Sequence, residues 1–124
     1  MEMQALAITI APIYVGEKLK MYQEAGDQSQ KNWDNTPEDE KALIIQQVLY
    51  VLTHPAYDAA AVHANLVRQK RAAGWKLGPV FSKEDRTDPD LVDYSQLPQL
   101  RRDSDALFVA TVKKYNPVSD IPVQ

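Results

Sequence analysis

The sequence predicts a mainly α-helical protein, a compact four-helix module with short β-strands and a long pinned loop between the third and fourth helices. Three observations support this fold class. Apolar residues recur at helical spacing in four segments. Capping residues stand at the ends of these segments, and a stretch rich in Gly, Pro and Asp over residues 75–96 separates the last two. The length of 124 residues fits one domain.

The first helix is expected to start after Thr9, whose hydroxyl can cap free backbone amides, and to end at Gly26. Residues 1–9 are then an N-terminal extension. The pattern predicts that the inward stripe of this helix consists of Ile10, Ile13, Tyr14 and Met21.

The second helix has the most distinct start in the chain, because Thr36 can cap it and Pro37 suits its first position. It is apolar on much of its circumference and ends near His54, so we expect it to be central. The third helix runs from the capping residue Asp58 to Gly74, which suits a left-handed C-terminal cap.

Two short extended pieces, residues 75–77 and 91–94, are expected within the long loop. Loops of this length are usually functional or firmly held. The final helix begins near Pro98 and ends before Asn116, since a proline follows that residue. Residues 117–124 are expected to be a flexible C-terminal tail.

Composition limits the class of protein. The 14 basic against 17 acidic residues give a net charge of -3, which argues against a binder of nucleic-acid polymers. The chain has no cysteine, which excludes disulfides, a thiol nucleophile and thiolate metal sites. It also has no apolar run near the roughly 20 residues that span a bilayer. We therefore expect a cytoplasmic protein without a membrane partner.

Three of the four helices carry an ionisable residue on the side expected to face inward. These residues are Glu17 in the first helix, His63 and Lys70 in the third, and Asp105 in the fourth. Buried charges require partners. The four groups therefore form either an internal salt-bridge network that fixes the loop or the lining of a polar ligand pocket.

A second indication of a ligand is the charge distribution. Residues 62–83 contain no acidic residue and include Trp75. The basic residues of this segment are Arg68, Lys70, Arg71, Lys76 and Lys83. Basic groups bind phosphate and an indole can pack on a base, so the segment suits a small anionic ligand with a stackable ring. The alternative is a solvated helix face followed by an acidic loop.

Signatures of catalysis are sparse. No GxSxG, P-loop, GxGxxG or HExxH motif is present, and His54 and His63 are too few for a recognisable metal site. We expect a protein that is not an enzyme and that has neither a metal nor a cofactor.

Two longer segments resemble the RyR domain family, the repeats of ryanodine receptor channels that also occur as standalone domains in bacteria and phages. They are KRAAGWKLGPV at residues 70–80 and DPDLVDYSQLP at residues 88–98. Residues 26–30, followed by Trp33 and Pro37, resemble the first-half motif of the family.

The resemblance implies an RyR-like domain over residues 10–116, with a concave face that in several members is associated with adenine nucleotides or nucleotide-derived signals. Carried over by position, it implies a ligand-binding set of Glu17, Tyr22, Trp33, His63, Lys70, Trp75, Tyr94, Arg102 and Asp105.

The sequence thus predicts a non-enzymatic binding module for a nucleotide-derived small molecule, either an adenine nucleotide or a cyclic or ADP-ribose-type signal. Such a module would serve as a phage or bacterial sponge or sensor in antiviral signalling, and a homo-oligomer is compatible with this role. The alternative is a structural or protein-interaction domain whose inward polar residues form only an internal network.

Overall fold

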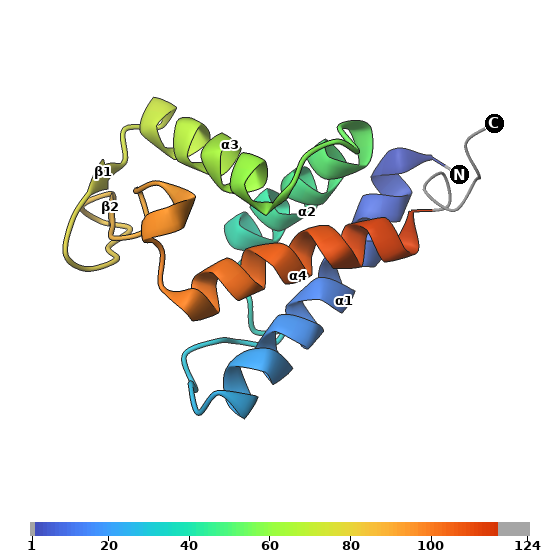
Figure 1. The fold of residues 1–124 in the computed structure, drawn as a ribbon, viewed down its shortest axis with the longest axis horizontal. Helices are drawn as coiled ribbons and strands as arrows, with labels where there is room; N and C mark the ends of the chain where they lie inside the picture. The colour runs from blue at the N-terminus through green and yellow to red at the C-terminus, as the bar shows by residue number, and fades with distance from the viewer. Residues whose placement is uncertain (1, 117–124) are drawn as a thin grey trace.

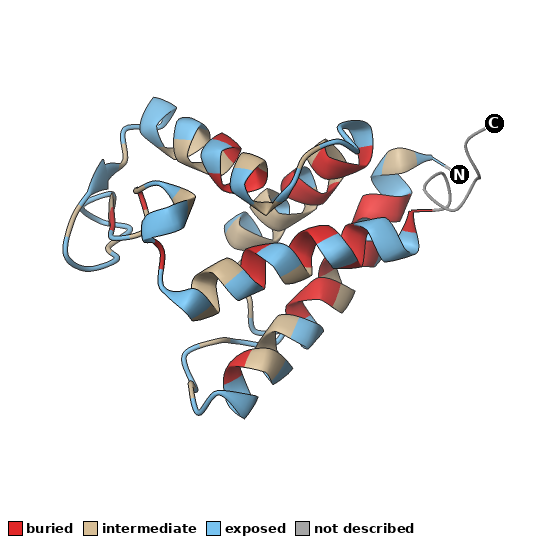
Figure 2. Cartoon of the chain, in the orientation of Figure 1, coloured by how far each residue is buried: buried red, intermediate tan, exposed pale blue. Residues whose placement is uncertain are grey.

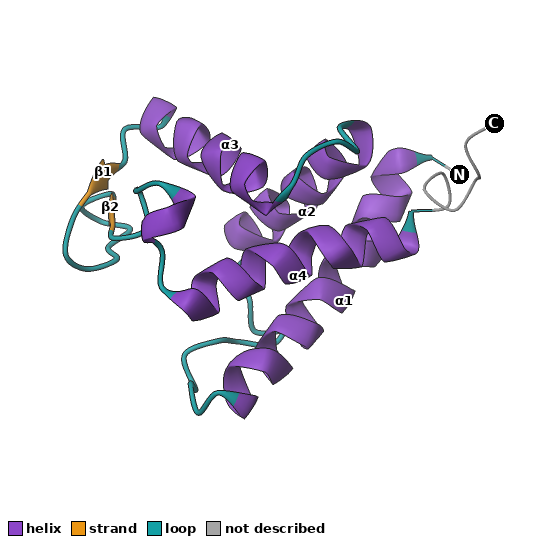
Figure 3. Cartoon of the chain, viewed as in Figure 1, coloured by secondary structure: helices purple, strands orange, loops and turns teal. Residues whose placement is uncertain are grey.

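A computed structural model describes residues 2–116 and confirms the mainly α-helical fold. Its helices are α1 (Met3–Glu24), α2 (Glu38–Thr53), α3 (Ala59–Ala72) and α4 (Gln99–Tyr115). The long connection between α3 and α4 holds two short parallel strands and a single 3₁₀ turn (Figure 3). The predicted tail, residues 117–124, lies outside the described residues.

Helix α1 begins seven residues earlier than the sequence indicated. Glu2 caps it, accepting a hydrogen bond of 3.1 Å from the backbone N–H of Gln4. The predicted extension is therefore helical from Met3 onward. Pro12 lies inside the helix rather than in its first turn, and the carbonyl left without a partner belongs to Ile8, an exposed residue that water can reach.

The core lies where α1 packs on α2 and crosses α4, and buried segments of these helices gather there in Figure 2. Ile10 and Val48 are fully buried there, and the ring of Tyr14 meets Phe108 edge to face with centroids 4.9 Å apart. Helix α3 packs against α4 with its first turns and extends away from the core toward the strands (Figure 1). This arrangement leaves space between α3, α2 and the first turns of α4, and the long loop closes over that space.

The caps of α3 are as predicted. The side chain of Asp58 accepts a 2.9 Å hydrogen bond from the N–H of Ala61, and Gly74 has a φ of +90°, a left-handed conformation that favours glycine.

The loop differs from the sequence prediction in its second extended piece. Strand β1 (Lys76–Leu77) pairs in parallel with β2 (Thr87–Asp88), whereas residues 91–94 form no strand. Thr87 also exchanges two backbone hydrogen bonds with Ser82, so the pairing is fixed by this turn. Gly78 lies so close that a Cβ added there would come within 2.8 Å of Thr87. Residues 91–94 instead lead into the turn η1 (Tyr94–Gln96).

Among residues 2–116, the four helices include none with both the length and the apolar character that a membrane span requires.

Substitutions at the start of α1 test whether residues 3–9 belong to the folded body. Leu6 is 7% exposed and packs in the core, whereas Ile8 on the same helix is 51% exposed. Leu6→Ala should lower the free energy of unfolding by about 2 to 4 kcal/mol, while Ile8→Ala should change it by less than about 0.5 kcal/mol. Urea denaturation measures both. Equal and small effects would mean that this segment does not pack on the core.

Candidate functional site

A cavity of about 410 Å³ lies between the four helices and the loop. Its walls are largely apolar, and the apolar side chains that line it include Leu43, Ile44, Val62, Leu66, Val67, Leu91 and Phe108. The charged or polar side chains at the same cavity are Lys18, Gln47, His63, Lys70, Asp88, Asp90, Arg101 and Asp105.

Three of the predicted site residues meet at this cavity, namely His63, Lys70 and Asp105. A fourth, Trp75, lines an adjoining groove on the same side of the molecule. The convergence of inward charges from α3 and α4 is therefore as predicted, although the ligand that they would contact is not shown by this geometry.

The other predicted site residues lie elsewhere. Glu17 is exposed and its Oε2 accepts a 3.3 Å hydrogen bond from Thr111, so the prediction that it points into the pocket is wrong. Tyr22 is buried outside the cavity lining, and Trp33 lies half-buried beneath Lys41, whose Nζ is 5.3 Å from the ring centroid.

Arg102 also faces away from the cavity. Its guanidinium donates to Gln99, and its backbone carbonyl accepts a 3.0 Å hydrogen bond from the hydroxyl of Tyr94. Tyr94 thus ties the loop to α4 instead of lining the cavity. The arginine at the cavity is the preceding residue, Arg101. Neighbouring residues of a helix point in directions about 100° apart, so an error of one position in the sequence prediction is enough to select Arg102 instead of Arg101.

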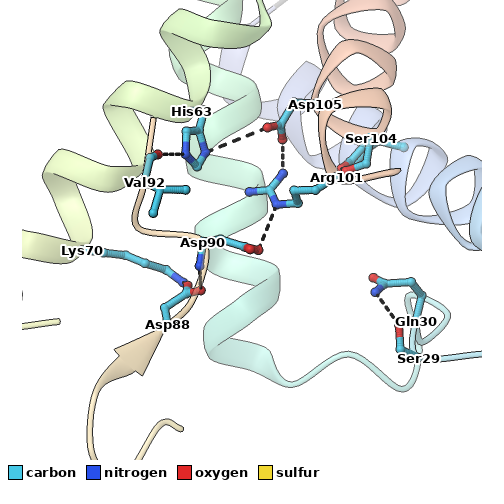
Figure 4. Close-up of polar contacts among 11 residues, drawn as sticks. Ser29, Gln30, His63, Lys70, Asp88, Asp90, Val92, Arg101, Ser104 and Asp105 are labelled. Atoms are coloured by element: carbon cyan, nitrogen blue, oxygen red, sulfur yellow. Dashed lines mark hydrogen bonds and ion pairs between the residues drawn. The ribbon is translucent and has the colours of Figure 1, made fainter. Parts of the chain in front are cut away.

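Arg101 joins the loop to α4. Its guanidinium forms an ion pair with Asp105 one turn along the helix, and its Nε lies 3.4 Å from Oδ2 of Asp90 in the loop (Figure 4). Burial works against the charge of Arg101, but Asp105, Tyr14 and Asp90 together outweigh that effect, and the pKa of the guanidinium rises. Lys70 on α3 holds the loop in the same way, with Nζ 2.6 Å from Oδ2 of Asp88.

His63 provides a third connection to the loop. Its Nε2 lies 2.8 Å from the carbonyl oxygen of Val92, and because a carbonyl only accepts, Nε2 carries the proton. The opposite ring nitrogen, Nδ1, is 3.9 Å from Oδ2 of Asp105, and neither atom has a hydrogen bond within residues 2–116. Burial raises the pKa of the Asp105 carboxyl, and Arg101 only partly offsets this effect.

The sequence analysis missed Lys18, which replaces Glu17 as the inward ionisable residue of α1. Lys18 lines the cavity and forms no ion pair within residues 2–116. Its Nζ lies 5.9 Å from the ring centroids of both Tyr14 and Tyr22. The i, i+4, i+8 spacing of these three residues places them on one helix face, and this spacing is the signal that could have identified Lys18.

The environment of Lys18 disfavours its positive charge. Burial lowers the pKa of this amine to about 8, and the nearby charge of Arg101 contributes in the same direction. The charges of Asp105, Glu40 and Asp90 offset this lowering only in part, and Lys18 faces the cavity without an ion pair within residues 2–116. An anion placed beside it would supply the missing partner.

Within the described part of the chain, no three His, Asp or Glu side chains are grouped so that they could hold a metal ion. The cavity combines apolar walls, two cations paired with carboxylates, and Lys18, which forms no ion pair within residues 2–116.

Comparisons with known protein families, with curated proteins and with solved structures found no match to this chain. The resemblance to RyR domains therefore remains a prediction from the sequence.

Replacement of Lys18 should show how much its buried charge lowers the free energy of unfolding. The uncharged Lys18→Met variant should be more stable than the parent at pH 7 by about 1 to 2 kcal/mol, a value reduced for partial solvent screening. Between pH 8 and about 10.5 the unfolded lysine binds more protons than the folded one, so the parent gains stability as the pH rises. The advantage of the variant should therefore shrink over this interval.

Urea denaturation of both proteins at pH 7 and pH 10 measures this difference. Lys20→Met is the matched control, because Lys20 is exposed on the same helix and lines neither hollow. If Lys18→Met behaved like the control at both pH values, the amine would be fully solvated and not a feature of the cavity.

Proposed function

We propose that this protein binds a nucleotide-derived small molecule in the cavity without converting it chemically. The observation that carries the proposal is the position of Lys18, a cation without an ion-pair partner in residues 2–116, at the wall of a largely apolar cavity of about 410 Å³. Small-molecule sites in proteins are typically about 300 to 1,000 Å³ and combine apolar walls with a few polar groups. The cavity is large enough for a nucleoside.

The apolar walls favour a ring system. A planar base would be buried among aliphatic side chains such as Leu43 and Leu66 and the ring of Phe108. Burial of apolar area supplies affinity at about 25 cal/mol per Å² before the costs of binding. The charged part of the ligand would contact Lys18, because Lys70 and Arg101 are already tied to carboxylates.

The resemblance to RyR domains supports the same class of ligand, since members of that family are associated with adenine nucleotides and nucleotide-derived signals. A role as a phage or bacterial sponge or sensor in antiviral signalling is part of this proposal.

A second candidate function is a structural or protein-interaction domain. It is favoured by the ion pairs of Lys70 with Asp88 and of Arg101 with Asp105, which neutralise much of the charge that faces the cavity. It is also favoured by exposed apolar side chains on the loop, Leu77, Val80 and Phe81, which are 57%, 65% and 53% exposed. Under this alternative the polar groups only hold the loop in place.

Thermal unfolding with added nucleotides separates the two functions. AMP and ADP-ribose should raise the melting temperature of the parent in proportion to the logarithm of ligand concentration above the dissociation constant. Lys18→Met should lose most of this shift while remaining folded, and Lys20→Met should retain it. If neither ligand, nor cyclic nucleotides, shift the melting temperature at millimolar concentration, the interaction domain becomes the better conclusion.

Replacement of Lys70 is less suitable for this test. Its removal leaves the buried carboxylate of Asp88 without an ion pair, and breaking a buried pair from one side typically costs about 3 to 5 kcal/mol.

A further inference from the structure

The cavity continues into a wider groove of about 790 Å³ on the outer side of α1 and α2. The two hollows share part of their lining, and the shared residues are Lys18, Leu43, Ile44, Lys70 and Phe81. Lys18 and Lys70 therefore stand at the boundary between an inner cavity and an outer groove that together form one cleft.

The inner cavity is electrically balanced. Three cations line it, Lys18, Lys70 and Arg101, together with three carboxylates. Asp105 and Asp90 flank Arg101, and Asp88 is bound to Lys70, whereas Lys18 forms no ion pair within residues 2–116. A phosphate placed deep in this cavity would be repelled by the three carboxylates, which favours an uncharged group there.

The outer groove carries an excess of positive charge. Five basic side chains line it but only two carboxylates, Asp39 and Glu40. Both carboxylates are bound by Lys83, at 3.3 and 3.4 Å. Lys31 and Arg86 also line this groove and form no ion pair within residues 2–116. Together with Lys18 they make three basic groups without a carboxylate partner along one path.

We propose that the ligand spans both hollows, with its uncharged ring in the inner cavity and two or more phosphate groups in the outer groove. The inference rests on the proposed function and narrows it to nucleoside polyphosphates, in which a diphosphate or triphosphate follows the sugar. The first phosphate lies beside Lys18 at the boundary, and the later ones lie toward Lys31 and Arg86. A single phosphate would leave the outer groove unused.

This arrangement predicts an affinity that depends on phosphate number. The phosphates interact with partly solvated cations, so each one added should strengthen binding several-fold at low salt, and added salt should weaken the gain. Lys31 is exposed and serves no ion pair within the described residues, so its replacement leaves the fold unchanged. Arg86 is unsuitable for replacement, because its guanidinium donates to the carbonyl of Ala73.

Isothermal titration calorimetry with adenosine, AMP, ADP, ATP and inorganic triphosphate tests the proposal. ATP should bind at least tenfold more tightly than AMP, and triphosphate without a base should bind more weakly than ATP. Lys31→Gln should weaken ATP binding three- to tenfold and leave AMP binding unchanged. The matched control, Lys20→Gln, should alter neither.

Two results would overturn this inference while the proposed function stands: equal affinities for AMP and ATP, or equal losses of AMP and ATP binding in Lys31→Gln. Triphosphate binding as tightly as ATP would show that the inner cavity takes no ring, which contradicts the inference and points to anion binding alone. No heat of binding from any of the five compounds would contradict both the inference and the proposed function.

Discussion

The shape of this protein depends on ion pairs that fasten one loop to two helices. The connection between α3 and α4 has only four strand residues and one short turn of its own, so little regular structure holds it. Arg101, Lys70 and His63 each reach it from a helix, at Asp90, Asp88 and the carbonyl of Val92. Because these groups are partly or fully buried, each must keep its partner, and the loop is thereby held over the apolar space between the helices.

The attachment of the loop by polar contacts also explains why the cavity and the destabilising charge of Lys18 occur together. A loop held by polar contacts does not fill the space beneath it as an apolar segment would. Lys18 faces that space with its charge disfavoured by burial and by Arg101. Under the proposed function, an anion beside Lys18 would offset this unfavourable charge, and proteins tolerate such local instability at functional positions.

Local signals in the sequence were sufficient for most of the helix boundaries. Asp58 caps α3 and Gly74 ends it because these effects act within a few residues. The orientation of α1 about its own axis was not predictable in this way, since it depends on which face meets α2 and α4. The sequence prediction was wrong by one position on each helix: it placed Glu17 and Arg102 at the site, where the structure has Lys18 and Arg101. The partner of β1 was missed for a similar reason: the Thr87 to Ser82 turn, rather than strand propensity, determines the pairing.

The depressed basicity of Lys18 has a consequence for how the cleft responds to its surroundings. Because burial lowers the pKa of this amine to about 8, a substantial fraction of it is neutral near that pH. Under the proposed function, an anion beside the nitrogen would restore its basicity, so binding at or above this pH would take up a proton from solution. Proton and anion would then bind with positive linkage, each strengthening the other. Ligand binding would accordingly strengthen as the pH falls toward neutrality, without any movement of the backbone.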